Sequence, residues 1–177
     1  MQKPNLTLWF TGLHGSGKST IAKRLAYILR EKNIPVILLD GDELRKTISS
    51  DLGYSAEERN EHMKRVADLC KTTADKGSLV IASVASPTQK SRDYARKTLK
   101  KMLLVYVKCP LEVCAERDVK GHYKKAKENK KGFEHFMKVS LEFEEPANPD
   151  IILETDKETV DESVNRLLDK LQRGRIV

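Results

Sequence analysis

The sequence has few cysteines and few aromatic residues: three cysteines occur among its 177 residues, and Phe, Trp and Tyr together make up 6%. Cys70, Cys109 and Cys114 lack the spacing of a zinc site, and an odd number of thiols cannot all pair with one another. We therefore expect reduced thiols in or near the core. With so few aromatic side chains to stack on bases, a role in binding nucleic acid is disfavoured.

Long hydrophobic runs are also missing. No apolar stretch approaches the roughly 20 residues of a membrane-spanning helix, and residues 1–4 lead into a predicted strand without a signal-peptide pattern. We expect a cytoplasmic protein with no membrane partner. Lysine and arginine outnumber aspartate and glutamate by 33 to 26, a formal charge of +7 that suits an anionic small molecule and equally nucleic acid. The length suits a single domain spanning 1–177.

The most informative stretch is Gly12-Leu13-His14-Gly15-Ser16-Gly17-Lys18-Ser19-Thr20. It has the spacing G-x-x-x-x-G-K-S of a phosphate-binding loop, in which glycines let successive backbone N–H groups face a polyphosphate. Lys18 can reach the outer phosphates, and the Ser19 hydroxyl can ligate Mg²⁺. An apolar strand at 6–10 precedes the loop and helical spacing follows it, which is the order that this motif requires. The stretch predicts binding of a nucleoside triphosphate.

Apolar runs alternate with helical patterns along the rest of the chain. Further buried strands are predicted at 35–39, 79–82, 103–107 and 151–153, and helices at 89–99, from the capping box Ser55–Glu58 onward, and near Thr159 and Glu162. Continuous apolar strands separated by helices are typical of a parallel sheet covered on both faces. We therefore predict an α/β fold, a three-layer sandwich of the P-loop NTPase type.

Two acidic residues follow the second predicted strand. Ligands in open parallel sheets lie beyond the carboxyl ends of the strands, so Asp40 and Asp42 are expected beside the phosphate-binding loop. One of them, with Ser19, can hold Mg²⁺, for which we favour Asp40; the other can accept a proton from an attacking hydroxyl. The alternative is that Asp42 only caps the helix that begins there.

Other polar residues are expected at the same edge. Arg45 and Arg59 can each grip a phosphate or sulfate in a forked geometry, although a surface salt bridge is the alternative for either residue. Ser83 directly follows the third predicted strand. Ser86 can contact a phosphate or cap the helix that follows Pro87, and the cap is favoured.

The segment from Lys120 to Glu145 is rich in lysine and glutamate and poor in apolar residues. It is either a solvated helix or a lid that folds over phosphates at about 120–145, and the pattern does not separate the two. A guanine-reading Asn-Lys-x-Asp element is absent, since Asn129-Lys130-Lys131-Gly132 lacks the aspartate. A small chain with these features is typical of a kinase of small molecules.

The sequence resembles the adenylylsulfate kinase family from about Leu8 to Leu153. The stretches that carry the resemblance are the phosphate-binding loop, Leu39-Asp40-Gly41-Asp42 with Arg45, Asp51-Leu52-Gly53-Tyr54-Ser55, Arg59, Ile81-Ala82-Ser83, Ser86-Pro87, Cys114-Ala115-Glu116-Arg117-Asp118, Lys120-Gly121-His122-Tyr123-Lys124-Lys125-Ala126 and Pro146-Ala147-Asn148-Pro149. The resemblance implies MgATP-dependent phosphorylation of the ribose 3′-hydroxyl of adenylyl sulfate, and a homodimer.

The resemblance also implies roles for particular residues. Asp42 would assist the 3′-hydroxyl, Arg45 and Arg59 would hold the acceptor nucleotide, and Arg117 would lie near the ATP base. Ser86 matches a serine that the family describes as a phosphoserine intermediate, although direct in-line transfer needs none. The lysines of the lid, Lys124 among them, would offset charge on the phosphates together with Lys18.

Departures from the family pattern fall in the acceptor half. His62 stands where the family has Asn, Val84 where it has Phe, and Tyr54 replaces another Phe. The lid sequence is replaced by 136–144, in which Phe136 can stack on a base and Lys138 is new.

Three functions remain open at this point. Adenylyl sulfate is favoured as the acceptor. The first alternative is a 3′-kinase of another 5′-diphosphate-type nucleotide, such as cytidine diphosphoramidate in capsular polysaccharide modification. A distant alternative is a non-enzymatic, nucleotide-dependent RNA binder.

Overall fold

The computed structural model describes residues 5–118, 120–128, 130 and 142–174. Five parallel strands form one sheet in the order β2-β3-β1-β4-β5. The strands are β1 Leu6–Thr11, β2 Val36–Asp40, β3 Leu79–Ser83, β4 Met102–Lys108 and β5 Ile151–Glu154. The helices are α1 Lys18–Glu31, α2 Gly41–Lys46, α3 Ala56–Asp75, α4 Gln89–Thr98, α5 Leu111–Arg117, α6 His122–Lys127 and α8 Val160–Arg173. Phe136 and Lys138 lie outside the described residues.

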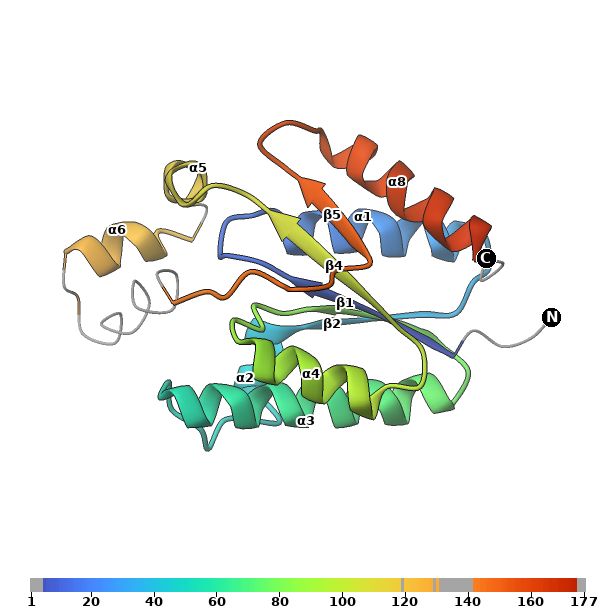
Figure 1. Cartoon of the computed structure of the whole chain (residues 1–177), viewed down its shortest axis with the longest axis horizontal. Coiled ribbons are helices and arrows are strands. Elements are labelled where there is room, and N and C mark those ends of the chain that lie inside the picture. Colours follow the sequence, from blue (N-terminus) through green and yellow to red (C-terminus); the bar gives the residue numbers. More distant parts are fainter. Residues whose placement is uncertain (1–4, 119, 129, 131–141, 175–177) are drawn as a thin grey trace.

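Helices cover both faces of the sheet (Figure 1). The α1 and α8 helices pack on one face, where Leu8 and Phe10 of β1 contribute to the core, and α3 and α4 pack on the other, where Trp9 is fully buried. Alternate residues of one strand therefore enter two different cores, as the uninterrupted apolar runs indicate. The predicted three-layer α/β sandwich is confirmed.

The two predicted helix starts are also confirmed. Ser55 and Glu58 form a capping box at the start of α3, and Thr159 and Glu162 form another at α8. Each box satisfies two backbone N–H groups that a helix start otherwise leaves without partners.

The α5 and α6 helices lie beyond the carboxyl ends of the central strands (Figure 1). A small apolar cluster around Cys109, Cys114 and Tyr123, with Leu13 packed against it, joins these helices to the phosphate-binding loop. All three cysteines are free and buried, as expected. No helix within the described residues is long and apolar enough to cross a membrane.

Candidate active site

The glycine-rich loop connects β1 to α1 and has a backbone that only glycine can supply. Gly15 has φ +79°, and a Cβ atom there would lie 2.7 Å from the carbonyl oxygen of Cys114. At Gly12 a Cβ atom would lie 2.4 Å from the carbonyl oxygen of Val107. The loop is therefore held against β4 and α5 at distances that exclude a side chain.

Lys18 begins α1 and bends back over the loop. Its Nζ atom donates to the carbonyl oxygens of Gly12 at 2.9 Å and Leu13 at 2.6 Å. Burial lowers the pKa of Lys18 to about 8, although the charges of Asp42 and Asp40 oppose this shift. The ammonium group is therefore still predominantly charged at pH 7, as a phosphate-binding lysine must be.

Ser19, Asp40 and Ser83 meet beside the loop, as expected. The Ser19 hydroxyl donates to Asp40 Oδ2 at 3.0 Å and lies 3.2 Å from Ser83 Oγ. Asp40 and Ser83 are paired across β2 and β3, so the sheet register fixes this arrangement. Asp40 Oδ1 also accepts a hydrogen bond from the backbone N–H of Asp42 at 3.0 Å and caps α2. The alternative interpretation, that Asp42 only caps this helix, is therefore wrong.

Because Asp42 does not cap α2, its carboxylate can face the phosphate-binding loop. Its Oδ2 atom accepts a hydrogen bond from Lys120 Nζ, in an ion pair that joins α2 to the segment preceding α6. Burial raises the pKa of Asp42, but the hydrogen bond from Lys120 and the charges of Lys120 and Lys18 outweigh burial and lower it overall. Asp42 is therefore ionised at neutral pH.

His14 stands on the loop opposite α6. Its ring lies 6.0 Å from the ring of His122, edge to face, and its carbonyl accepts from the Tyr123 hydroxyl at 3.0 Å. Burial, followed by the charge of Lys18, lowers the pKa of His14 to about 4. The loop histidine is therefore neutral at pH 7 and adds no repulsion toward Lys18.

Arg45 and Arg59 approach the same edge from α2 and α3. The Arg45 guanidinium lies over the Tyr54 ring, 4.9 Å from its centroid, and Tyr54 itself is exposed. Among the described residues, Arg45 Nη1 and Arg59 Nε are buried without a hydrogen-bond partner. Burial lowers the pKa of both guanidinium groups. Buried donors that lack a partner are costly, and two of them on neighbouring cations indicate a site for an anion.

His62 is buried between α2 and α3. Its Nδ1 atom lies 2.8 Å from Ser49 Oγ, and burial, followed by the charge of Arg45, lowers its pKa to about 4. His62 therefore supports the 47–54 loop that carries Tyr54. The bidentate ion pair of Arg65 with Asp51, with distances of 2.6 and 2.9 Å, supports the same loop.

Ser86 is placed differently from the prediction. The residue is fully buried with φ +42°, and its hydroxyl lies 3.0 Å from Ser91 Oγ. The cap of α4 is Thr88, whose hydroxyl accepts from the Ser91 N–H at 3.2 Å, so the expectation that Ser86 caps this helix is wrong.

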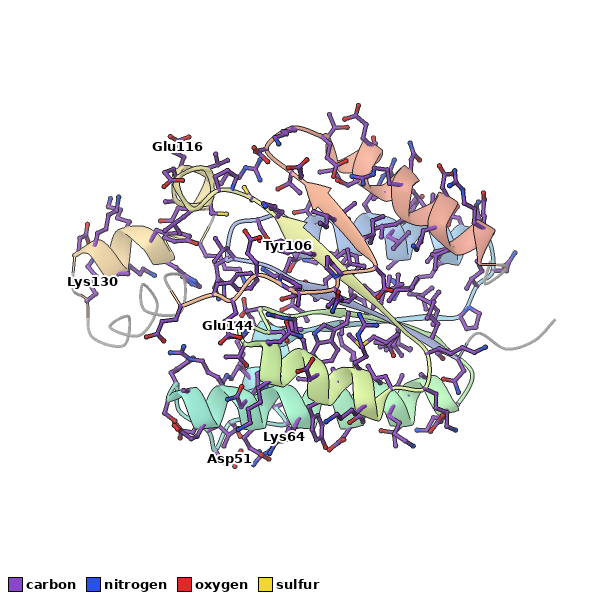
Figure 2. All side chains as sticks on the ribbon, viewed as in Figure 1. Asp51, Lys64, Tyr106, Glu116, Lys130 and Glu144 are labelled. Atoms are coloured by element: carbon purple, nitrogen blue, oxygen red, sulfur yellow. The ribbon has the colours of Figure 1, made fainter. Side chains whose placement is uncertain are left out.

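Arg92 explains the shape of this turn. Its buried guanidinium donates to the carbonyl oxygens of Ser86 and Glu144, both at 2.7 Å. Figure 2 shows Glu144 beside the start of α4, where its carboxylate accepts from the Gln89 N–H. Segment 142–146 is thereby fastened to the turn between β3 and α4.

Arg117 ends α5 and is exposed. It donates to the hydroxyl of Thr155 at 3.3 Å and to the carbonyl oxygen of Thr155 at 2.6 Å. The Thr155 hydroxyl in turn donates to the carbonyl oxygen of Ser16 at 2.7 Å. Lys124 is exposed on α6, and Thr20 is exposed in the first turn of α1.

Sequence reasoning missed the roles of Lys120 and Thr155. Lys120 lies 78 residues from its partner Asp42, and no local pattern links the two. The available indication for Lys120 was its position, beside Gly121 and directly before a basic helix. Thr155 directly follows the last strand, so the rule that ligands lie beyond strand ends pointed toward it.

Comparison with known proteins shows which proteins this chain is similar to. Residues 4–154 match the sequence model of a family described as adenylylsulphate kinase. The adenylyl-sulfate kinase of Clostridium acetobutylicum is 40% identical over 100% of this chain and 88% of its own length. That of Marinobacter nauticus is 43% identical, covering 99% and 88%. The solved structure of the Mycobacterium tuberculosis APS kinase CysC in complex with AMPPNP and APS has 37% identity and a TM-score of 0.87, covering 94% of this chain and 96% of that one.

Proposed function

The chain belongs to the adenylylsulphate kinase family, and on that premise we propose that it transfers the γ-phosphoryl group of ATP to the 3′-hydroxyl of adenylyl sulfate (APS), giving 3′-phosphoadenylyl sulfate and ADP. The mycobacterial relative was solved with APS and with AMPPNP, an analogue of ATP. The observation that carries the proposal is the meeting of Lys18, Asp40 and Asp42 at one edge of the sheet.

Magnesium fits the residues present at that edge. Mg²⁺ in phosphoryl-transfer enzymes is held by one or two side-chain oxygens, water and the phosphates, and Ser19 Oγ and Asp40 Oδ2 already lie within hydrogen-bond distance of each other. When bound, the ion would neutralise charge on the β- and γ-phosphates. We propose that Ser19 and Asp40 hold it, Asp40 directly or through water.

The remaining chemistry belongs to Lys18, Asp42 and Lys120. Lys18 would leave the loop carbonyls and bind the outer phosphates. The ionised Asp42 carboxylate would accept a hydrogen bond from the acceptor hydroxyl and orient it for in-line attack. An ammonium group has three donors, so Lys120 can hold Asp42 and reach the transferring group at once.

Arg45 and Arg59 would bind the anionic 5′ end of the acceptor. Their buried, unpartnered N–H groups suit a charged oxygen better than water, because such hydrogen bonds are roughly twice as strong as neutral ones. Tyr54 is fixed under Arg45 and offers an exposed ring for a base. Arg117 would lie against the adenine of ATP.

An acceptor panel tests the function. Acceptor-dependent ADP release with MgATP is compared for adenylyl sulfate, cytidine diphosphoramidate and simple nucleoside diphosphates, and the product is identified by mass spectrometry. We expect the highest kcat/KM for adenylyl sulfate. A higher kcat/KM for cytidine diphosphoramidate would move the assignment to that nucleotide, and no acceptor-dependent turnover would refute the kinase.

Three variants control the panel. Lys18→Ala should abolish turnover, whereas Lys23→Ala, an exposed lysine of the same helix, should not change it. Ser19→Ala should raise the Mg²⁺ concentration needed for half-maximal rate.

Assembly and location stay predictions. We propose a homodimer in the cytoplasm that binds neither nucleic acid nor membrane. Light scattering on the purified chain measures whether it is a dimer. RNA filter binding across a salt series tests the alternative of an RNA binder.

A further inference from the structure

One threonine joins three segments that are distant in sequence. Thr155 follows β5, and its hydroxyl donates to the carbonyl oxygen of Ser16 in the phosphate-binding loop, 139 residues away. The same hydroxyl accepts from Arg117 Nη1, and the Thr155 carbonyl accepts from Arg117 Nη2. The Thr155 backbone N–H is fixed in turn by the carbonyl oxygen of Lys108 at the end of β4, at 3.0 Å.

The bond to Ser16 has a consequence for the loop backbone. Ser16 lies between Gly15 and Gly17, which both have positive φ, at +79° and +98°, so the peptide units on either side of it can rotate at small cost. The carbonyl and the N–H of one trans peptide unit point in opposite directions. Holding the Ser16 carbonyl toward Thr155 therefore turns the Gly17 N–H to the opposite side.

The bonds to Arg117 have a consequence for its side chain. An exposed arginine loses conformational freedom when it is fixed, and this loss weakens any binding that requires one orientation. Two hydrogen bonds from one guanidinium to one residue fix both the position and the plane of the group. Arg117 therefore presents an oriented planar cation before any ligand arrives.

We propose that Thr155 is a positioning residue for ATP: through Ser16 it orients the loop amide toward the phosphates, and through Arg117 it sets a planar guanidinium against the adenine. The proposal rests on one part of the proposed function, the binding of ATP at the phosphate-binding loop. One threonine would thereby connect the residues that bind the phosphate end of the nucleotide with the arginine that binds its base end.

The experiment compares Thr155→Val, which keeps the shape and removes the hydroxyl, with Thr155→Ser, which keeps the hydroxyl. We expect Thr155→Val to raise the Kd for ADP and the KM for ATP about tenfold, the effect of roughly one lost charge-assisted hydrogen bond. The KM for adenylyl sulfate should not change, kcat should stay within about twofold, and Thr155→Ser should restore ADP binding to within about threefold.

A control separates positioning from loss of stability. Thr159→Val removes the hydroxyl that caps α8 four residues further on, so it should lower Tm without raising the Kd for ADP. If Thr155→Val raises both KM values together, or if Thr159→Val weakens ADP binding as much, Thr155 is structural only and the proposal fails. Wild-type affinity for ADP in Thr155→Val overturns it as well.

A double-mutant cycle tests the route through Arg117. In the Arg117→Ala background, Thr155→Val should cost less ADP affinity than it does alone, because one of its two targets is gone. Full additivity would overturn the Arg117 half of the proposal. ADP binding needs no acceptor, so these results stand apart from the acceptor panel, whose failure would refute the kinase assignment and leave the positioning role intact.

Discussion

The Nζ atom of Lys120 donates a hydrogen bond to Oδ2 of Asp42, and this ion pair joins α2 to the residues that precede α6. Each partner is about half exposed, so the pair contributes little to stability and its importance lies in the charge state of Asp42.

Replacing Lys120 should change the pH profile. The bond from Lys120 is the largest influence that lowers the pKa of Asp42, while burial raises it. In Lys120→Met the pKa of Asp42 should therefore rise, and the acid limb of kcat/KM should move to higher pH. Lys46→Met, which removes an exposed lysine of α2 paired with Glu43, should leave the limb in place. An unmoved limb in Lys120→Met would contradict the role of this pair.

Removing the Asp42 carboxylate should slow phosphoryl transfer. General-base contributions are about 10²- to 10⁴-fold, so Asp42→Ala and the equally sized Asp42→Asn should both lower kcat by about that factor. Glu43→Ala, which removes the neighbouring exposed carboxylate, should stay within about twofold of wild type. Near-normal turnover by Asp42→Asn, measured as ADP release at saturating substrates, would remove Asp42 from catalysis.

Replacing Arg45 or Arg59, the two arginines that we propose bind the acceptor, should weaken acceptor binding selectively. A lysine keeps the charge but loses the forked donor pair, so Arg45→Lys and Arg59→Lys should each raise the KM for adenylyl sulfate about 10- to 100-fold. The KM for ATP should not change. Arg24→Lys, on the α1 surface beside Asp161, is the matched control. Equal increases in both KM values would show a general distortion instead.

Two glycine substitutions separate backbone strain from steric clash. Gly15 and Gly121 have similar φ values, +79° and +64°, but a Cβ atom at Gly121 meets nothing within 4 Å. Gly121→Ala should cost about 1–2 kcal/mol, the strain of a left-handed residue. Gly15→Ala should cost more and should also abolish ADP binding, because its Cβ atom meets backbone. Equal unfolding midpoints in urea for Gly15→Ala and Gly121→Ala would contradict this, because they would mean that the phosphate-binding loop moves to accommodate the Cβ atom.

Acid should destabilise the fold partly through His62. The pKa of this histidine is about 4 in the folded protein and about 6.5 when exposed, so the unfolded chain binds the extra proton between these pH values. Above pH 6.5 His62 is neutral in both states and the free energy of unfolding is not reduced. As the pH drops toward 4, protonation of the unfolded chain lowers the free energy of unfolding by at most about 3 kcal/mol. In His62→Asn the free energy of unfolding should depend less on pH between 7 and 5. If the slope of unfolding free energy against pH were unchanged in His62→Asn, groups other than His62 would determine the acid sensitivity.

The fold could be predicted from sequence where a short run of residues is enough to determine the element and its place in the fold. The run at 79–82 is apolar on both faces because β3 lies inside the sheet, and the boxes at Ser55 and Thr159 need only four consecutive residues. The sequence did not show which aspartate caps α2, because Asp40 and Asp42 both suit a cap. In the structure Asp40 is the cap, and its other carboxylate oxygen accepts a hydrogen bond from the Ser19 hydroxyl.

The rest depended on contacts distant in sequence. The position of Ser86 depends on Arg92, six residues away, whose guanidinium also binds the carbonyl oxygen of Glu144, 52 residues further along, and no local pattern predicts that second contact. The partners of Lys120 and Thr155 lie 78 and 139 residues away, so they appear only once the strands are ordered. The roles assigned to Phe136 and Lys138 stay predictions.

The burial of Ser86 bears on the stereochemistry of the reaction. A hydroxyl with no exposed surface that is engaged with Ser91 cannot receive a phosphoryl group unless the turn that holds it opens first. The site as folded therefore favours a single displacement, and an ATP made chiral at its γ-phosphorus would yield a product of inverted configuration.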